Sequence, residues 1–233
     1  MERSFREQRR HSLPVRVMHW INVIAVLALL MSGLQIFNAH PSLYWGASSY
    51  TGRPAIFSLA HGFPGWATLP GVQWLAMGRR WHFFFAWVFV INGIAYIAYS
   101  IASGHARRDL VPTRTDWRSI GRSIVEHLRL HHPVGDEATR YNVLQRLAYV
   151  GLIFVVLPFL ILMGLGLSPR LDAAWPWLVD AFGGRQSMRT LHFIAASVLV
   201  LFVLVHLFEV IVSGPWNQVR SMITGKFRVP EEK

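Results

Sequence analysis

Apolar residues along this chain fall into four long blocks separated by more polar segments. The blocks cover roughly residues 17–37, 81–101, 147–167 and 191–212. Each has the length of about 20 residues that an α-helix needs to cross a bilayer at about 1.5 Å per residue. Pro158 interrupts the third block and predicts a kink, which membrane helices tolerate. The pattern therefore predicts an all-α membrane protein built as a four-helix transmembrane bundle.

The segments between the blocks predict further structure. The long segment at about 38–80 is rich in Trp, Tyr, Gly and Pro, which suits a structure lying in the membrane interface. Within it, 56–61 and 72–77 are expected to form short re-entrant or surface helices. Apolar residues recur along one face of 116–130, which predicts an amphipathic helix on the cytoplasmic surface. No internal repeat divides the chain, so residues 1–233 are predicted to form a single domain.

Positive charge is distributed unevenly among the connecting segments. The chain carries 23 Lys and Arg, 12 Asp and Glu, and a formal net charge of +11. Segments 1–16, 103–146 and 213–233 hold 17 of the 23 basic residues, and the two other connections with their flanks hold the remaining 6. The positive-inside rule therefore places both termini in the cytoplasm, with the 38–80 loop external. This alternation argues against nucleic-acid binding as the source of the charge.

The chain has no cysteine. This absence excludes disulfides, thiolate-bound iron–sulfur clusters and covalently attached c-type haem. A redox cofactor would have to be held by His or Met without covalent attachment. The basic N-terminus followed by an apolar run resembles a signal peptide, but the run is too long and lacks a cleavage site, so we expect a retained first span.

Four of the eleven histidines lie inside the apolar blocks, at His19, His82, His192 and His206. An ionisable side chain in a membrane span is unfavourable and therefore indicates a functional site. In the predicted orientation, His19 and His206 lie near the cytoplasmic face and His82 and His192 near the outer face. His192 and His206 are fourteen residues apart, so they share one side of a helix and are separated by about 21 Å along its axis.

This arrangement predicts two haem b groups, each held by two histidines. His206 pairs with His19, and His192 pairs with His82. Ligation by two histidines fills both axial positions of the iron, which suits electron transfer rather than oxygen chemistry. The pairs are too far apart to share a zinc or copper ion. Hydrogen bonding across helices is the alternative role for each histidine, and His61 is the rival to His82 as the outer ligand.

Two glycines accompany the histidines at helical spacing. Gly33 follows His19 by fourteen residues and Gly93 follows His82 by eleven, so each returns near the ligand-bearing side of its helix. We expect them to make room for a flat macrocycle, with ordinary small-residue helix packing as the alternative.

Charged residues flank the two predicted haem levels. Arginine suits the anionic haem propionates, and anchoring at the membrane surface is an equal alternative for the arginines concerned. Glu209 is the only acidic residue within the four spans, one turn after His206. It either moves protons at a quinone pocket or reaches the cytoplasmic interface. The arginines are Arg16, Arg79, Arg80, Arg189 and Arg220.

Several motifs resemble the bacterial di-haem cytochrome b superfamily, which includes membrane subunits of nickel–iron hydrogenases, respiratory formate dehydrogenases and thiosulfate reductases. The resemblance covers nearly the whole chain. It implies a four-helix fold, two b-type haems, a bound quinone and a periplasmic catalytic partner, and it maps the four ligands onto the same four histidines. The 38–80 loop resembles that of cytochromes that accompany a periplasmic molybdopterin oxidoreductase. The motifs are Arg16-Val-Met-His19-Trp20, His40-Pro41-Ser-Leu-Tyr44-Trp45-Gly46, Tyr141-Asn142-Val-Leu-Gln145-Arg146, Arg189-Thr-Leu-His192 and His206-Leu-Phe-Glu209.

The predicted function is that of a multi-pass cytochrome of the bacterial inner membrane. It passes electrons between a periplasmic, molybdopterin-dependent oxidoreductase and the quinone pool, as an electron-transfer subunit rather than a catalyst alone. A homo-oligomer is left open. One alternative is a self-contained quinone-linked oxidoreductase acting on a small diffusible species such as superoxide. The other is a non-redox membrane transporter or sensor whose histidines form a polar path.

Overall fold

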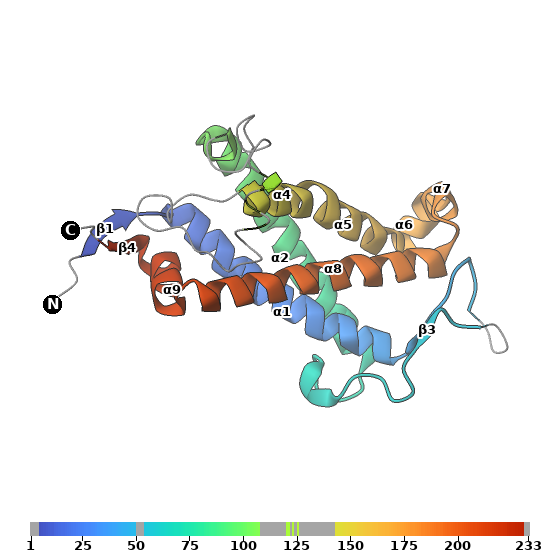
Figure 1. The fold of residues 1–233 in the computed structure, drawn as a ribbon. Coiled ribbons are helices and arrows are strands. Elements are labelled where there is room, and N and C mark those ends of the chain that lie inside the picture. Colours follow the sequence, from blue (N-terminus) through green and yellow to red (C-terminus); the bar gives the residue numbers. More distant parts are fainter. Residues whose placement is uncertain are drawn as a thin grey trace. The chain divides into compact units, whose positions relative to one another are not determined.

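Four long helices hold the apolar blocks (Figure 1). The computed structural model describes residues 5–49, 54–107, 120–121, 123, 125 and 143–230. Within these ranges, four helices are long and apolar enough to cross a membrane. They are α1 (Leu13–Asn38), α2 (Leu75–Ala102), a third helix over Val143–Gly166 and α8 (Arg185–Val212). Each begins a few residues before its apolar block, and the prediction of an all-α membrane protein is confirmed.

The third spanning helix changes its winding in the middle. It consists of α4 (Val143–Gly151), a π-helical segment (Leu152–Val156) and α5 (Leu157–Gly166). Pro158 has no N–H to donate, and its ring clashes with the carbonyl of the residue four positions earlier. A wider π turn is one of the ways in which a helix accommodates such a residue. The interruption predicted at this proline therefore takes the form of a π-helical segment.

The α1–α2 loop contains little regular structure. Strands β2 (Ser42–Leu43) and β3 (Phe57–Ser58) pair antiparallel, and a single 3-10 turn, η1, follows at Gly65–Ala67. The helix expected at 56–61 is wrong, because the backbone there pairs with the segment just after α1. The prediction of a separate helix at 72–77 is also wrong, because residues 75–77 form the first turn of α2 (Leu75–Ala102).

The amphipathic helix predicted over 116–130 lies largely outside the described residues. The positions described there, 120, 121, 123 and 125, are helical.

Short elements follow α5 and α8. Helices α6 (Pro169–Ala174) and α7 (Pro176–Ala181) connect α5 to α8, and a small core of Met163, Val179 and Met188 packs beneath them. After α8, helix α9 (Pro215–Thr224) leads into strand β4 (Lys226–Pro230). Strand β4 pairs antiparallel with β1 (Phe5–Arg9), so the two ends of the chain form one ribbon.

The chain divides into two compact units, and every spanning helix contributes a part to each. The first unit comprises Met1–Ile21, Asn92–Ile153 and Phe202–Lys233; the second comprises Asn22–Ile91 and Phe154–Leu201. The first unit thus contains His19, His206 and the terminal ribbon, and the second contains His82, His192 and the α1–α2 loop. That the whole chain forms a single domain stays a prediction.

Candidate functional site

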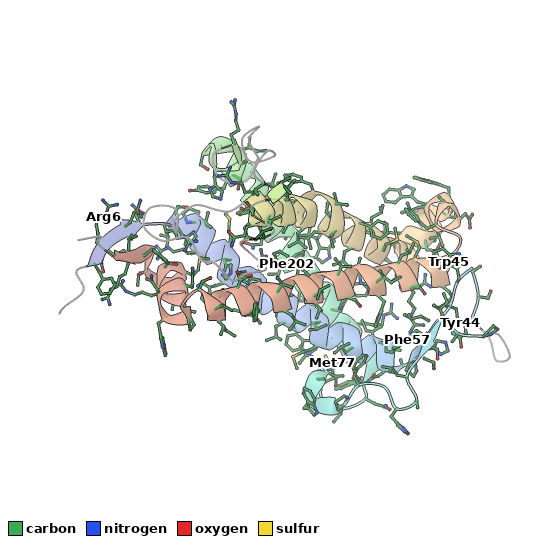
Figure 2. The ribbon with its side chains drawn as sticks, in the orientation of Figure 1. Arg6, Tyr44, Trp45, Phe57, Met77 and Phe202 are labelled. Atoms are coloured by element: carbon green, nitrogen blue, oxygen red, sulfur yellow. The ribbon has the colours of Figure 1, made fainter. Side chains whose placement is uncertain are left out.

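The first unit brings together His19 from α1 and His206 from α8. Their ring centroids lie 6.4 Å apart, with an angle of 62° between the ring planes. Phe202, one turn before His206, lies parallel to the His206 ring at a centroid distance of 6.3 Å; its place on α8 is labelled in Figure 2. The Nδ1 atom of His19 is buried and has no hydrogen-bond partner among the described residues. The buried Asn92 of α2 donates to the carbonyl of Met18 at 2.8 Å and so holds the backbone beside His19.

The second unit brings together His82 from α2 and His192 from α8. Their ring centroids are 6.2 Å apart, with an interplanar angle of 69°. The structure therefore places the four predicted histidines in the two pairs that their sequence positions indicated. His61, the rival to His82, is an exposed residue of the α1–α2 loop.

The spacing within each pair fits one metal ion bound between two imidazoles. A metal–nitrogen bond to histidine is about 2.0–2.1 Å long, and the bound nitrogen lies about 1.2 Å from its ring centroid, so two ligands on opposite sides have centroids about 6.4 Å apart. The observed values are 6.4 and 6.2 Å. In the described part of the chain, no group of three or more His, Cys, Asp or Glu could hold a metal ion. Each pair could hold one haem iron through its two imidazoles.

Hydrogen bonding fixes the tautomer of His192. Its Nδ1 lies 3.0 Å from the carbonyl oxygen of Leu160 on α5. A carbonyl can only accept, so Nδ1 carries the proton and donates it. In the neutral ring, Nε2 then keeps its lone pair free, as a metal ligand requires.

Ser32 fixes the tautomer of His82 in the same way. The fully buried Ser32 hydroxyl lies 2.6 Å from the carbonyl oxygen of Ala28, to which it donates its only proton. Its oxygen also lies 3.1 Å from Nδ1 of His82 and can therefore only accept there. His82 thus carries its proton on Nδ1 and leaves Nε2 free.

Glycines lie against both rings of the second pair. A Cβ at Gly164 would stand 3.1 Å from Cε1 of His192, which is closer than ordinary van der Waals contact, so only glycine fits without a shift. A Cβ at Gly33 would stand 3.5 Å from Cε1 of His82. At Gly93, in the first unit, no atom of the described residues lies within 4 Å of the Cβ position. The predicted role of Gly33 and Gly93, to make room for a macrocycle, stays a prediction. Gly164 was not singled out, because the third helix carries no histidine from which to count.

The arginines expected beside haem propionates bond to the protein backbone. Arg16 donates to the carbonyl of Ile223 in α9. Arg189 donates to the carbonyls of Ser42, at 2.9 Å, and His40, and its guanidinium lies 5.6 Å from the Phe37 ring centroid.

The other charged residues near the predicted haem levels have varied surroundings. Arg220 pairs with Glu7, and the Arg79 guanidinium lies 5.9 Å from the Phe83 ring centroid. Arg80 is exposed and Glu209 is half-buried. A propionate role for the arginines and a proton-transfer role for Glu209 stay predictions.

The α1–α2 loop is fixed directly to the start of α8. Thr190 donates to the carbonyl of Tyr44 at 2.7 Å, and the fully buried Ser187 accepts from the Gly46 amide at 2.8 Å. The Gly46 carbonyl in turn accepts from the Gln186 amide at 2.9 Å. Figure 2 labels Tyr44 and Trp45 in this segment. The loop is therefore attached within one to two turns of His192.

Comparison with known proteins identifies the family. The prokaryotic cytochrome b561 family matches residues 10–225. A putative protein-methionine-sulfoxide reductase subunit YedZ1 from Azospira oryzae is 31% identical over 82% of this chain and 85% of its own length. Probable Ni/Fe-hydrogenase B-type cytochrome subunits are also similar. That of Cupriavidus necator is 25% identical over 92% of this chain and 84% of its own length. That of Rhodobacter capsulatus is 24% identical over 92% of this chain and 79% of its own length. No solved structure gave a significant match. The chain belongs to the prokaryotic cytochrome b561 family and is a multi-pass bacterial membrane cytochrome of b type that transfers electrons.

Proposed function

We propose that this cytochrome holds two haem b groups and transfers electrons between a periplasmic oxidoreductase and the membrane quinone pool. His19 and His206 would hold one haem, and His82 and His192 the other. The observation that carries the proposal is the presence of two histidine pairs, one in each unit, with ring centroids 6.4 and 6.2 Å apart. Haem iron, when bound, supplies one-electron redox chemistry, and two histidine ligands leave no coordination position for oxygen.

The residues around the second pair prepare it for ligation. The Leu160 carbonyl and the Ser32 hydroxyl keep the proton on Nδ1 of each ring. Partners of this kind orient a ligating imidazole and increase its basicity. Gly164 lets the third helix approach the His192 ring closely enough for the Leu160 contact. Both bonds run between helices and use only Nδ1, so Nε2 of each ring stays available to hold an iron.

The α1–α2 loop supports docking of a periplasmic partner. The relatives named above are described as a reductase subunit and as hydrogenase cytochrome subunits, so each works with another protein. In the predicted orientation this loop and α6–α7 are external, and large aromatic side chains are exposed on them, as at protein interfaces. A molybdopterin oxidoreductase is the partner type that we infer from the loop's resemblance. The exposed aromatic residues are Trp45, Trp66, Trp74, Trp175 and Trp177.

Haem counting in ligand variants tests the proposal. The full-length protein, purified in detergent, should contain two b-type haems per chain by haem extraction, with sharp low-spin bands in the reduced-minus-oxidised spectrum. His206→Ala and His192→Ala should each leave one haem, and the double variant none. His61→Ala, an exposed histidine, serves as the control and should keep both. Two haems in either single variant, or a colourless folded wild type, would contradict the ligand assignment.

A further inference from the structure

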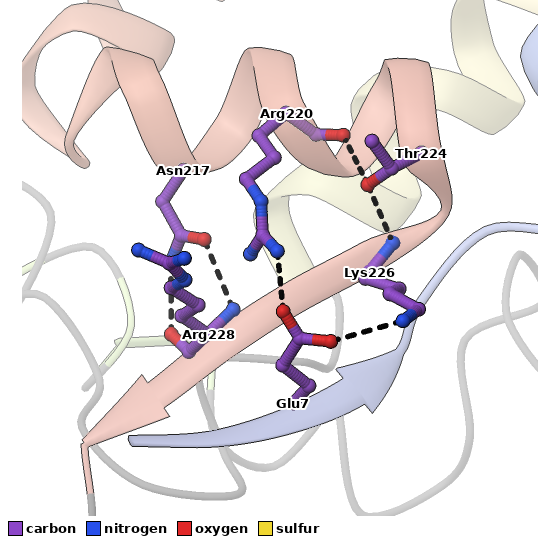
Figure 3. Close-up of polar contacts among 6 residues, drawn as sticks. All are labelled: Glu7, Asn217, Arg220, Thr224, Lys226 and Arg228. Carbon is purple, nitrogen blue, oxygen red and sulfur yellow. Dashed lines mark hydrogen bonds and ion pairs between the residues drawn. The ribbon is translucent and has the colours of Figure 1, made fainter. Parts of the chain in front are cut away.

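Helix α9 has its polar side facing the protein. Ser221 is fully buried. Gln218 accepts a hydrogen bond from Arg10 at 2.9 Å. Asn217 exchanges two hydrogen bonds with the backbone of Arg228 on β4, at 2.9 and 3.0 Å (Figure 3). A surface helix of a protein in water normally places its apolar side inward.

The apolar side of α9 faces outward instead. Trp216 is 88% exposed and Ile223 is 61% exposed, with Val219 exposed between them. Residues at these spacings lie on one side of an α-helix. A helix with this arrangement is adapted to an apolar environment on its outer side rather than to water.

The position of α9 in its unit identifies that environment as the lipid bilayer. Helix α9 begins three residues after α8 ends, beyond a turn at Gly214 with φ +90°. The last turns of α8 expose Phe208 and Ile211, as expected for a spanning helix in contact with lipid. The exposed apolar residues of α9 therefore continue the lipid-facing surface of the span before it.

The far end of α9 is tied to the start of the first span. Arg16 donates to the carbonyl of Ile223, and the Trp20 indole donates to the carbonyl of Met222 at 3.1 Å. A cation at the carboxyl end of a helix also interacts favourably with the helix dipole. Both ends of α9 are thus held where a spanning helix begins or ends, which is the depth of the membrane interface.

The ribbon and α9 carry an excess of positive charge. Five basic residues lie within β1, α9 and β4, and Glu7 is the single acidic residue there. Glu7 pairs with Arg220 and, at 3.1 Å, with Lys226 (Figure 3). Basic clusters beside a membrane span attract anionic lipid headgroups. The five residues are Arg6, Arg9, Arg220, Lys226 and Arg228.

We propose that α9 is an interfacial helix that lies in the plane of the membrane. Trp216, Val219 and Ile223 insert at the boundary between headgroups and acyl chains, and the β1–β4 ribbon contacts the anionic headgroups of the same leaflet. This proposal does not depend on haem binding or on a redox partner.

The absence of cysteine allows a direct test by spin labelling. The full chain carrying Trp216→Cys or Ile223→Cys, labelled with a nitroxide and reconstituted into phosphatidylcholine–phosphatidylglycerol vesicles, reports depth by its collision rates with oxygen and with a water-soluble nickel chelate. We expect both labels to be accessible to oxygen and protected from nickel. The control, Asp180→Cys, replaces an exposed acidic residue of α7, outside β1, α9 and β4, and should be nickel-accessible.

Three results would overturn the proposal. Nickel access at positions 216 and 223 would place α9 in water. Spin–spin broadening that disappears on dilution with unlabelled protein would identify a second copy as the covering partner. Equal label depth with and without phosphatidylglycerol would remove the role of anionic headgroups. If the labelled variants fail to fold, brominated lipids should quench the fluorescence of wild-type protein more than that of Trp216→Phe, and equal quenching would contradict insertion.

Discussion

The contact between Gly164 and His192 makes a quantitative prediction for the variant Gly164→Ala. The added methyl group would lie 3.1 Å from Cε1 and 3.4 Å from Nδ1 of His192, whereas carbon atoms in ordinary contact lie about 3.5–4.0 Å apart. The ring must therefore move by a few tenths of an ångström. That movement weakens the 3.0 Å bond from Nδ1 to the Leu160 carbonyl. The loss of one hydrogen bond amounts to about 1 kcal/mol, and overpacking adds about 1–3 kcal/mol.

The expected total of about 2–4 kcal/mol corresponds to roughly 30- to 1000-fold weaker haem binding at the His82–His192 pair. We expect purified Gly164→Ala to contain fewer than two haems per chain, and Gly164→Ala combined with His206→Ala to contain almost none. Gly151→Ala is the matched control, because Gly151 lies on the same spanning helix and no atom of the described residues is within 4 Å of its Cβ position. Full haem content and unchanged haem affinity in Gly164→Ala would refute the role of this contact.

Three further predictions concern other parts of the protein. Ser32→Ala removes the hydroxyl that accepts from Nδ1 of His82, although a backbone hydrogen bond to Leu29 remains, and should shift the potential of one haem only in a spectroscopic redox titration. Ser197→Ala, on an exposed hydroxyl, should shift neither potential. Arg189→Ala should release the α1–α2 loop and increase its cleavage rate by protease by at least about tenfold, because two hydrogen bonds of about 1 kcal/mol each are lost. Burial lowers the pKa of His11 from 6.5 to about 4, so the unfolded terminal segment binds a proton below pH 6.5 that the folded segment excludes. The free energy needed to open the β1–β4 ribbon should therefore decrease by about 2–3 kcal/mol as pH falls from 6.5 to 4. Hydrogen exchange of the ribbon, corrected for intrinsic exchange, should accelerate accordingly. The hydrogen bond from Arg220, together with Lys226, lowers the pKa of Glu7 from 4.5 to about 2. Protonation of Glu7 removes these contacts, so the ribbon should continue to lose stability as pH falls from 4.5 towards 2. Ribbon protection that does not change with pH would contradict this reasoning.

The spans and the histidine pairs were predictable because their signals are local and strong. A run of about 20 apolar residues has few alternatives to a membrane helix, and a histidine within such a run draws attention at once. The pairing then followed from depth along the helices, which depends only on residue number and the direction of each span. His19 and His206, which lie 187 positions apart in the sequence, are brought together in this way.

The supporting residues were not predictable, because their roles arise only from contacts between helices. Ser32 is one of several serines in apolar runs, and nothing in the sequence shows that it lies beside His82. The β1–β4 ribbon joins five-residue strands more than 200 positions apart, and neither strand has a clear alternation of apolar and polar residues. The helix expected at 56–61 failed for a similar reason, since pairing with Ser42 and Leu43 overrode local preference.

The two histidine pairs are supported by different means, and this difference determines what each variant can show. Both rings of the His82–His192 pair donate from Nδ1 to fixed acceptors and lie against glycines. The His19–His206 pair has no such acceptor for Nδ1 of His19 among the described residues; Phe202 stacks beside it and Asn92 holds the adjacent backbone. A substitution at Ser32 or Gly164 therefore acts on one pair and leaves the other as an internal reference. Because both haems would be counted in the same chain, loss at one site with retention at the other separates a local effect on a ligand from general unfolding of the membrane helices.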